Sequence, residues 1–169
     1  TYVGDNMWID HNMFIGCGGD WASGGSIKID YPSGGSTSPV MIVNNVIKDP
    51  YENPYSLEIG VQIVTGRVYV ANNILWGGLG GIGINRYYMG AADESVVEYN
   101  DFHNWYQNHT NVTLGVTNLY VNPLFVNPTN NADLHLQAGS PCINAGNPAA
   151  FYNDADATRN DMGIYGGNY

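Results

Sequence analysis

The chain has 169 residues and a formal net charge of −10, because 5 Lys and Arg stand against 15 Asp and Glu. So few cations argue against a nucleic-acid-binding protein and against binding to an anionic membrane surface. No apolar run reaches the roughly 20 residues of a membrane-spanning helix, so we expect no membrane insertion. Gly and Asn, which both favour tight turns, occur 22 times each, while strong helix formers are sparse. The composition therefore predicts a turn-rich, all-β chain.

A short motif recurs along the chain and consists of a strand, an asparagine at a bend, and a second strand. Its four copies occupy residues 8–14, 41–47, 69–75 and 96–102. Their shared asparagines lie 33, 28 and 27 residues apart, at Asn12, Asn45, Asn73 and Asn100. We predict a degenerate fifth copy centred on Asn122, 22 residues after Asn100. Further strands are predicted between the copies, at residues 27–31, 57–63 and 82–84.

Each repeat unit holds two or three short strands, too few to bury an apolar face alone. Stacking the units in parallel buries a continuous core, so the repeats predict a β-solenoid of about four to five coils. Equivalent asparagines then stack on successive coils, where their amides can both donate and accept hydrogen bonds along the axis. Asparagine also tolerates the left-handed backbone that a sharp corner needs. The alternative is that four asparagine turns of a β-sandwich match by coincidence.

At these residues the chain resembles the right-handed parallel β-helix repeat family, the pectate-lyase-like superfamily. The C-terminal third is similar to the closing segment of many secreted bacterial and archaeal members, with NPLFVNP at 122–128, DLHLQ at 133–137, GSPCINAG at 139–146 and RNDMGIYG at 159–166. The resemblance implies a right-handed parallel β-helix in one continuous domain, with coils over 1–121 and the last coil and a C-terminal cap over 122–169. It also implies secretion, so we expect an extracellular or cell-surface location.

The two ends of the stack are predicted to differ. An end of a solenoid exposes apolar core and unpaired strand edges, so it needs a polar cover. The segment from Pro123 is rich in Pro, Asn and Gly, and we expect it to fold over the last coil. Repeat residues begin within the first ten positions, so we expect the first coil to be open, covered by missing sequence or by another molecule.

Enzymes of the family cut polysaccharides, and its lyases typically use carboxylate-bound Ca²⁺ with an Arg or Lys as the base. Here the five cations lie in no recognisable motif, and the acidic signatures of the hydrolases do not occur. Asp93 and Glu94 form a lone acidic pair, but adjacent loop side chains need not converge as a glycosidase pair must. The histidines show no metal-binding spacing. We therefore assign no catalytic residue and no firm cofactor, and the sequence favours a non-catalytic protein over a polysaccharide lyase or glycoside hydrolase.

The tail loop, residues 154–161, is a weak candidate for Ca²⁺. Oxygen side chains recur in it at short spacing, as in Ca²⁺ sites, at Asp154, Asp156, Asn160 and Asp161. The EF-hand pattern fails, because its glycine is missing and Tyr165 stands where a bidentate Glu belongs. We prefer the alternative of a structural loop in which Arg159 pairs with Asp161 and anchors the cap.

Surface chemistry is predicted at two other places. Aromatic pairs in predicted loops are candidates for stacking on sugar rings, at Tyr87, Tyr88, Trp105 and Tyr106. Two glycosylation sequons begin at Asn108 and Asn111, and they matter only if the source glycosylates its proteins.

The two cysteines, Cys17 and Cys142, are predicted at opposite ends of the stack. A disulfide needs Cα atoms within roughly 7 Å, so we expect no bond within one chain. Head-to-tail stacking would bring Cys142 of one molecule near Cys17 of the next, which makes an intermolecular disulfide one alternative. The other, which we favour, is two buried free thiols.

The sequence supports two functions. The first is a non-catalytic extracellular β-solenoid with a structural role, which self-associates head-to-tail through its open first coil into a filament or surface assembly. The second is a carbohydrate-active fragment, lyase-like or sugar-binding, with a polysaccharide as its ligand. The absent catalytic motifs, the open first coil and the placement of the cysteines favour the first.

Overall fold

The computed structural model describes residues 7–17, 25–30, 38–48, 59–77, 81–87, 95–129 and 133–168. In these ranges the regular structure is almost entirely strand, with one single-turn 3-10 helix, η2 (Ala150–Tyr152). The prediction of an all-β chain is confirmed. The short strands follow from the sequence, because most are rich in β-branched residues, and left-handed residues such as Asn44, Asn72 and Asn104 end several of them.

Three parallel sheets of four strands each make up the body of the molecule. Sheet A contains β1 (Trp8–Asp10), β4 (Val40–Val43), β7 (Val68–Ala71) and β10 (Val96–Glu98). Sheet B contains β2 (Met13–Ile15), β5 (Val46–Lys48), β8 (Ile74–Trp76) and β11 (Asp101–His103). Sheet C contains β3 (Ile27–Ile29), β6 (Ile59–Ile63), β9 (Ile82–Arg86) and β12 (Gln107–Thr110).

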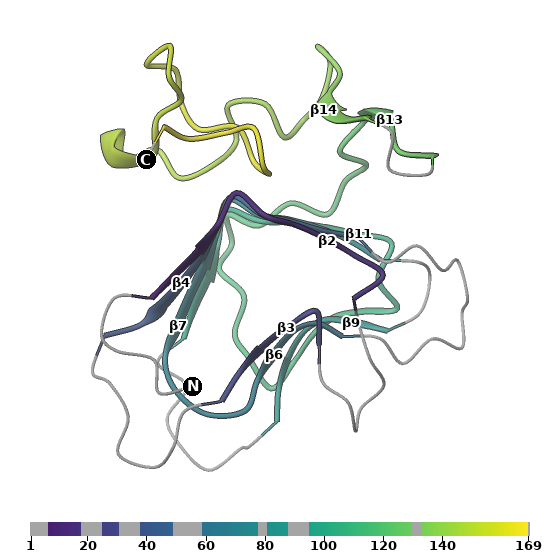
Figure 1. Ribbon diagram of the computed structural model, residues 1–169, viewed down its shortest axis with the longest axis vertical. Coiled ribbons are helices and arrows are strands. Elements are labelled where there is room, and N and C mark those ends of the chain that lie inside the picture. Colours follow the sequence, from purple (N-terminus) through teal and green to yellow (C-terminus); the bar gives the residue numbers. More distant parts are fainter. Residues whose placement is uncertain are drawn as a thin grey trace.

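The chain visits the three sheets in turn, so each coil contributes one strand to every sheet. Seen along the stack, the sheets form the three sides of a triangle (Figure 1). Strands of successive coils pair in register, as when Trp8 pairs with Met41 and Met41 with Tyr69. This parallel, three-strand coil is consistent with the predicted β-solenoid.

Columns of apolar side chains fill the inside of the triangle. In sheet A the column runs through Ile9, Ile42, Val70 and Val97, which pair in register and pack in one core cluster. Ile42 and Val70 are 0% exposed and Val97 is 2% exposed, whereas Ile9 at the first coil is only partly buried. Stacking identical positions on successive coils therefore buries each apolar residue against the coils on both sides.

The far end of the stack is crossed by residues 111–119, which pass from sheet C to the corner between sheets A and B (Figure 1). Val112 is buried in the core cluster, Gly115 N–H donates to Val97 O at 2.8 Å, and Leu119 forms a parallel bridge with Asp101. Residues 111–119 therefore cover the end of the stack that we expected the segment from Pro123 to cover.

The C-terminal region runs beside the coils. It contains an antiparallel pair, β13 (Phe125–Asn127) and β14 (Asp133–Leu136), followed by turns. From residue 123 onward it lies outside the triangle, over sheet B and the corner between sheets A and B (Figure 1). The expectation that this region folds over the last coil is not confirmed: its apolar residues Phe125, Leu134 and Met162 pack on the outer side of sheet B, against Val46 and Ile74.

Candidate functional site

An asparagine ladder runs along the corner between sheets A and B. The side-chain amide of each member donates to Oδ1 of the member on the next coil, with N–O distances of 3.2, 3.0, 2.9 and 3.1 Å, through Asn12, Asn45, Asn73, Asn100 and Asn118. The backbone N–H of the first four donates to the same oxygen, at 2.9 to 3.0 Å. The interior members are 0% exposed, so these bonds satisfy amides that would otherwise be buried without partners.

The fifth member is Asn118 and not Asn122, which corrects the predicted fifth repeat. Asn118 follows Asn100 by only 18 residues, because residues 111–119 cross directly to the corner without a strand in sheet A. Asn122 instead accepts a hydrogen bond from Leu124 N–H within its own turn, at 2.9 Å.

The left-handed backbone of the corner belongs to the residue before each ladder asparagine, and not to the ladder asparagine as expected. Its φ angles are 53, 51, 60 and 54° at His11, Asn44, Asn72 and Tyr99. The asparagine pairs at 44–45 and 72–73 fill both roles at the corner. The first residue of each pair adopts the left-handed turn, and the second forms the hydrogen bonds along the axis.

The ladder has a direction, so its two ends are chemically different. Every step donates from one coil to the coil that follows in sequence, which leaves Oδ1 of Asn12 without a donor among the described residues. At the other end the amide of Asn118 donates to Val97 O and Gly115 O, at 2.9 and 2.7 Å. The ladder is therefore closed at the far end and open to a further donor at the first coil.

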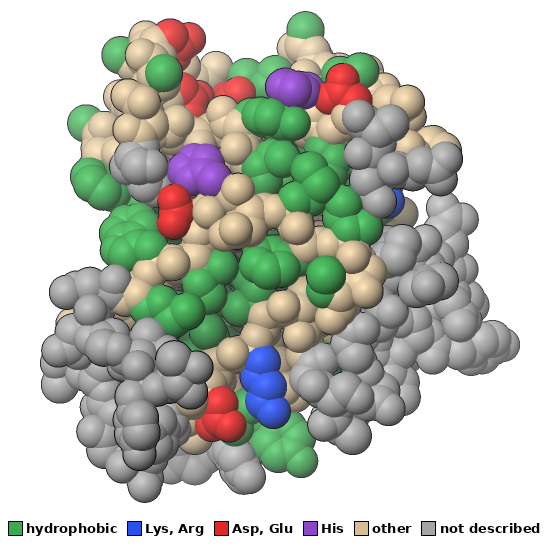
Figure 2. Space-filling model, viewed as in Figure 1, with side chains coloured by type: hydrophobic (Ala, Val, Ile, Leu, Met, Phe, Trp, Pro, Cys, Tyr) green, Lys and Arg blue, Asp and Glu red, His purple; other side chains and the backbone are tan. Residues whose placement is uncertain are grey.

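The open end also presents apolar surface. Figure 2 looks onto the first-coil end and shows hydrophobic side chains gathered at the centre of this face. Met7, Ile9 and Phe14 pack against the core but are only partly buried, and Trp8 is 38% exposed. The equivalents of Phe14 on the next coils, Ile47 and Leu75, are 1% and 0% exposed. We call Met7–Phe14 the first-coil edge.

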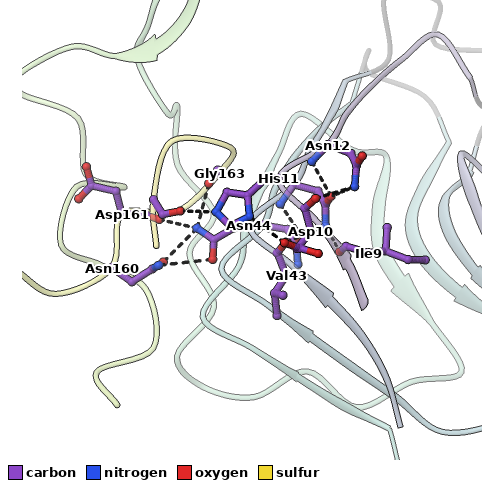
Figure 3. A network of polar contacts seen from close by, with 12 residues as sticks. Ile9, Asp10, His11, Asn12, Val43, Asn44, Asn160, Asp161 and Gly163 are labelled. Carbon is purple, nitrogen blue, oxygen red and sulfur yellow. Dashed lines mark hydrogen bonds and ion pairs between the residues drawn. The ribbon is translucent and has the colours of Figure 1, made fainter. Parts of the chain in front are cut away.

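Side chains at the left-handed positions point outward and bind the C-terminal region (Figure 3). Asn44 donates to the carbonyls of Asp161 and Gly163 and to Oδ1 of Asn160, at 3.1, 2.9 and 3.3 Å. In His11, Nε2 lies 2.7 Å from the carbonyl oxygen of Gly166, and Nδ1 lies 3.0 Å from Oδ2 of Asp10. The C-terminal region is thus fixed to the corner on the first two coils, far from its own end of the stack.

Two further contacts continue this attachment along the corner. Oδ1 of Asn72 accepts from Asn147 N–H at 2.7 Å, and Arg159 lies 5.8 Å over the ring of Tyr99. Arg159 also donates to Gly146 O and Ala145 O at 2.6 and 3.0 Å, so it binds backbone carbonyls in place of the predicted partner, the Asp161 carboxylate.

On the outer side of sheet A, Tyr69 joins the coils to the C-terminal region. Its hydroxyl donates to Glu98 Oε1 at 2.8 Å and accepts from Asn147 Nδ2 at 2.7 Å, while its ring stacks on Tyr152. Burial, and after it the bond to Glu98, raises the pKa of Tyr69 far above its usual range. The phenol therefore stays protonated and acts as a structural donor, not as a base.

The two cysteines differ in environment. Cys17 is exposed and Cys142 is 0% exposed, and both are free thiols. The thiol of Cys142 donates to Asp101 Oδ2 at 3.6 Å, and burial followed by the Asp101 charge raises its pKa. The expectation of a buried free thiol fits Cys142 but not Cys17. The intermolecular disulfide stays a prediction, and it requires the region around Cys142 to open.

The carboxylates of the tail loop accept hydrogen bonds mainly from backbone N–H groups of the C-terminal region. Asp154 accepts from Asp161 and Gly167 N–H, Asp156 from Thr158, and Asp161 from Asn144 N–H. Asn160 is buried and bonded to Asn44. Among the described residues, no group of three or more His, Cys, Asp or Glu side chains is arranged to hold a metal ion. The Ca²⁺ prediction gains no supporting geometry from this loop.

Of the predicted sugar-stacking residues, Tyr87 and Tyr106 are 51% and 82% exposed. Trp105 instead packs against the core, where its indole N–H donates to Leu75 O at 3.0 Å. A Cβ at Gly77 would lie 2.5 Å from Cδ2 of Trp105, so the glycine makes room for the indole. Tyr88, like Asp93 and Glu94, lies outside the described residues.

The sequons lie on and beside β12. Asn108 is part of the strand and only partly exposed, while Asn111 is exposed but donates to Arg86 O at 3.1 Å. An open hollow of about 400 Å³ is lined by residues 107 and 109–113, next to both sequons. Whether either is glycosylated stays a prediction.

Sequence reasoning missed a polar column on the outer face of sheet C. Strand register aligns Lys28, Gln62, Asn85 and Thr110, whose strand neighbours point into the core. Gln62 and Asn85 are 2% and 4% exposed. The hydroxyl of Thr110 is buried without a hydrogen-bond partner among the described residues. A buried hydroxyl without a partner is unfavourable, so at Thr110 this column offers a group that a polar ligand could bond. The sequence signal that could have revealed this column is the alternation of polar and apolar residues in the strands of sheet C.

Comparisons of the chain with protein-family models, with curated proteins and with solved structures found no match. In the described residues no helix is long and apolar enough to span a membrane. The interpretation of function therefore rests on the corner ladder, the first-coil edge and the polar column.

Proposed function

We propose that this chain is a non-catalytic, extracellular structural β-solenoid that assembles through its first-coil edge. We also propose that the solenoid is right-handed and pectate-lyase-like, and that residues 122–169 serve as its closing segment. The resemblance of the repeats and of the closing motifs supports both statements about fold.

The observation that carries the proposed function is the unfinished state of the ladder at Asn12. Its Oδ1 accepts no hydrogen bond from the described part of the chain, while Ile9 and Phe14 beside it are only partly buried. On every later coil the equivalent oxygen accepts two hydrogen bonds and the equivalent side chains are at most 2% exposed. An added coil that donates an amide at this corner and covers the two side chains would repeat the interface that already joins the coils.

Head-to-tail association of identical copies is the simplest such assembly. Its second surface would be the far end, where residues 111–119 cross the stack and the amide of Asn118 is already bonded within its own chain. A head-to-tail joint would therefore be held by apolar contact and strand pairing, without a ladder bond across it. An open-ended joint of this kind gives filaments, whereas a closed one gives oligomers of fixed size.

The test is sedimentation velocity across a hundredfold range of protein concentration, with negative-stain electron microscopy of the most concentrated sample. We expect concentration-dependent assembly by the unmodified chain. Asn12→Lys places a bulky charge on the edge and should abolish assembly, whereas Val126→Lys, at a side chain 51% exposed on the flank, should leave it intact. Monomers at every concentration, or equal effects of the two variants, would refute assembly through this edge.

A second candidate function, polysaccharide binding, is favoured by the polar column on sheet C. Its amides and hydroxyl have the chemistry that hydrogen-bonds sugar hydroxyls, and Tyr87 directly follows the strand that carries Asn85. Calorimetric titration with a panel of neutral and acidic polysaccharides, with and without Ca²⁺, tests it. We expect binding that is weakened by Asn85→Leu and unchanged by Val126→Lys. No binding and no turnover across the panel would exclude this candidate.

A further inference from the structure

The joint between the last coil and the C-terminal region contains a buried carboxylate, that of Asp101. Asp101 is the first residue of β11 and points outward from sheet B, in line with the apolar Ile74 and Val46. It is 0% exposed. A carboxylate in this apolar environment is unfavourable when ionised, unless cations or several hydrogen bonds stabilise it.

Few groups stabilise the ionised form. Oδ1 accepts from Val121 N–H at 3.0 Å and Oδ2 from the thiol of Cys142 at 3.6 Å, which is a weak donor at a long distance. No cation contacts Asp101 among the described residues. The titratable groups on this side include Asp161, whose negative charge acts on Cys142, and His103, which shares the outward face of β11 with Asp101 and packs against Trp76. The packed surroundings from sheet B and the C-terminal region are apolar, and include Ile74, Phe125, Leu134 and Met162.

We propose that Asp101, Cys142 and the backbone of Val121 form a pH-sensitive joint, which holds the C-terminal region against the last coil at mildly acidic pH and loosens it at neutral pH. Both partners of Asp101 belong to the chain that follows the coils, so the same contacts that solvate the carboxylate also close the joint. Opening the joint lets water reach the carboxylate and uncovers the buried outer side chains of Val46 and Ile74.

The direction of the effect follows from burial. Burial raises the pKa of Asp101 to about 6, against which the bonds from Val121 and Cys142 act. The extra stability of the closed joint is therefore complete below the ordinary pKa of an Asp, about 4, and is lost as the pH rises through about 6. Between pH 5 and pH 7.5 the population of the open joint should increase about tenfold.

The two cysteines provide the measurement. Cys142 reacts with a thiol reagent only when the joint opens, whereas Cys17 is exposed and serves as the internal reference in the same molecule. We would label the intact chain with 5,5′-dithiobis-(2-nitrobenzoic acid) from pH 5 to pH 8 and assign the sites by mass spectrometry. The ratio of the Cys142 rate to the Cys17 rate then isolates the opening equilibrium. We expect this ratio to rise about tenfold between pH 5 and pH 7.5.

Asp101→Asn keeps the acceptor for Val121 N–H and removes the titration, so its ratio should not change with pH. Asp133→Asn removes an exposed carboxylate from the same region and should behave as the unmodified chain does. A pH-independent ratio in the unmodified chain, or a tenfold rise that survives in Asp101→Asn, would overturn the proposal. Amide exchange of residues 133–168 in the unmodified chain gives a second measure that needs no variant, and it should show faster exchange relative to intrinsic rates at pH 7.5 than at pH 5.

Discussion

The asparagine ladder makes a sharp prediction, because the same substitution should have very different effects at its interior and at its open end. Asn73→Ala removes an Oδ1 that accepts from the backbone N–H and side-chain amide of Asn45, at 2.9 and 3.0 Å. It also removes an amide that donates to Ile42 O, Ala71 O and the Asn100 side chain. All of these groups are buried in a corner that water does not reach.

The loss of stability in Asn73→Ala is set by the buried groups that lose their hydrogen-bond partners. The backbone N–H of Asn45 loses its acceptor, and each orphaned buried group costs about 1–3 kcal/mol. With the loss of the amide donor added, Asn73→Ala should lower the free energy of unfolding by about 3–5 kcal/mol. Asn12→Ala should lower it by at most about 1 kcal/mol, because Asn12 is exposed and its Oδ1 accepts no bond from the described residues.

Urea unfolding followed by far-ultraviolet circular dichroism measures both values, with unchanged m-values as the check that only stability has altered. Samples should be dilute enough to be monomeric, so that assembly does not contribute. If the two substitutions destabilised the chain equally, the directional ladder would not be a source of its stability.

Three further predictions concern other parts of the molecule. Gly77→Ala should lower the midpoint of thermal unfolding, because the added Cβ meets the ring of Trp105, whereas Gly139→Ala, with nothing within 4 Å, should not. Arg159→Lys should destabilise the chain by about 1–2 kcal/mol in urea unfolding, since one ammonium cannot reproduce the two guanidinium bonds to backbone carbonyls. Adding Ca²⁺ or EDTA should leave the thermal midpoint unchanged in calorimetry, because Asp154 and its neighbours in the tail loop already bind backbone N–H groups; an upward shift with Ca²⁺ would restore the metal-site prediction.

The ladder could be predicted from sequence because its period is long, regular and marked by one residue type. Four of its five members follow from the spacing alone. The fifth, Asn118, was missed because the last coil omits a strand in sheet A and shortens the period to 18 residues. The position of the left-handed residue was missed by one, since the pairs at 44–45 and 72–73 do not reveal which asparagine turns the chain.

The place of the C-terminal region could not be predicted from local sequence. Its motifs were recognised, but its contacts are made to outward-facing side chains of coils far away in sequence, such as His11, 155 residues before Gly166. No periodic pattern records such a contact. The polar column of sheet C was missed for a related reason, because Gln62 and Asn85 align only once the register between their strands is known.

The direction of the ladder bears on how the molecule assembles. Two first-coil edges facing each other would bring two Asn12 oxygens together without a donor between them, so the ladder disfavours a symmetric pairing of identical edges. The far end offers no free ladder donor either, because Asn118 is bonded to Val97 and Gly115. The edge is therefore best completed by a coil that presents an unused amide at this corner. A joint between identical copies would have to be held by apolar contact and strand pairing, without a ladder bond. Comparing the assembly of the unmodified chain with that of Asn12→Leu, which keeps the apolar surface and removes the acceptor, separates these two contributions.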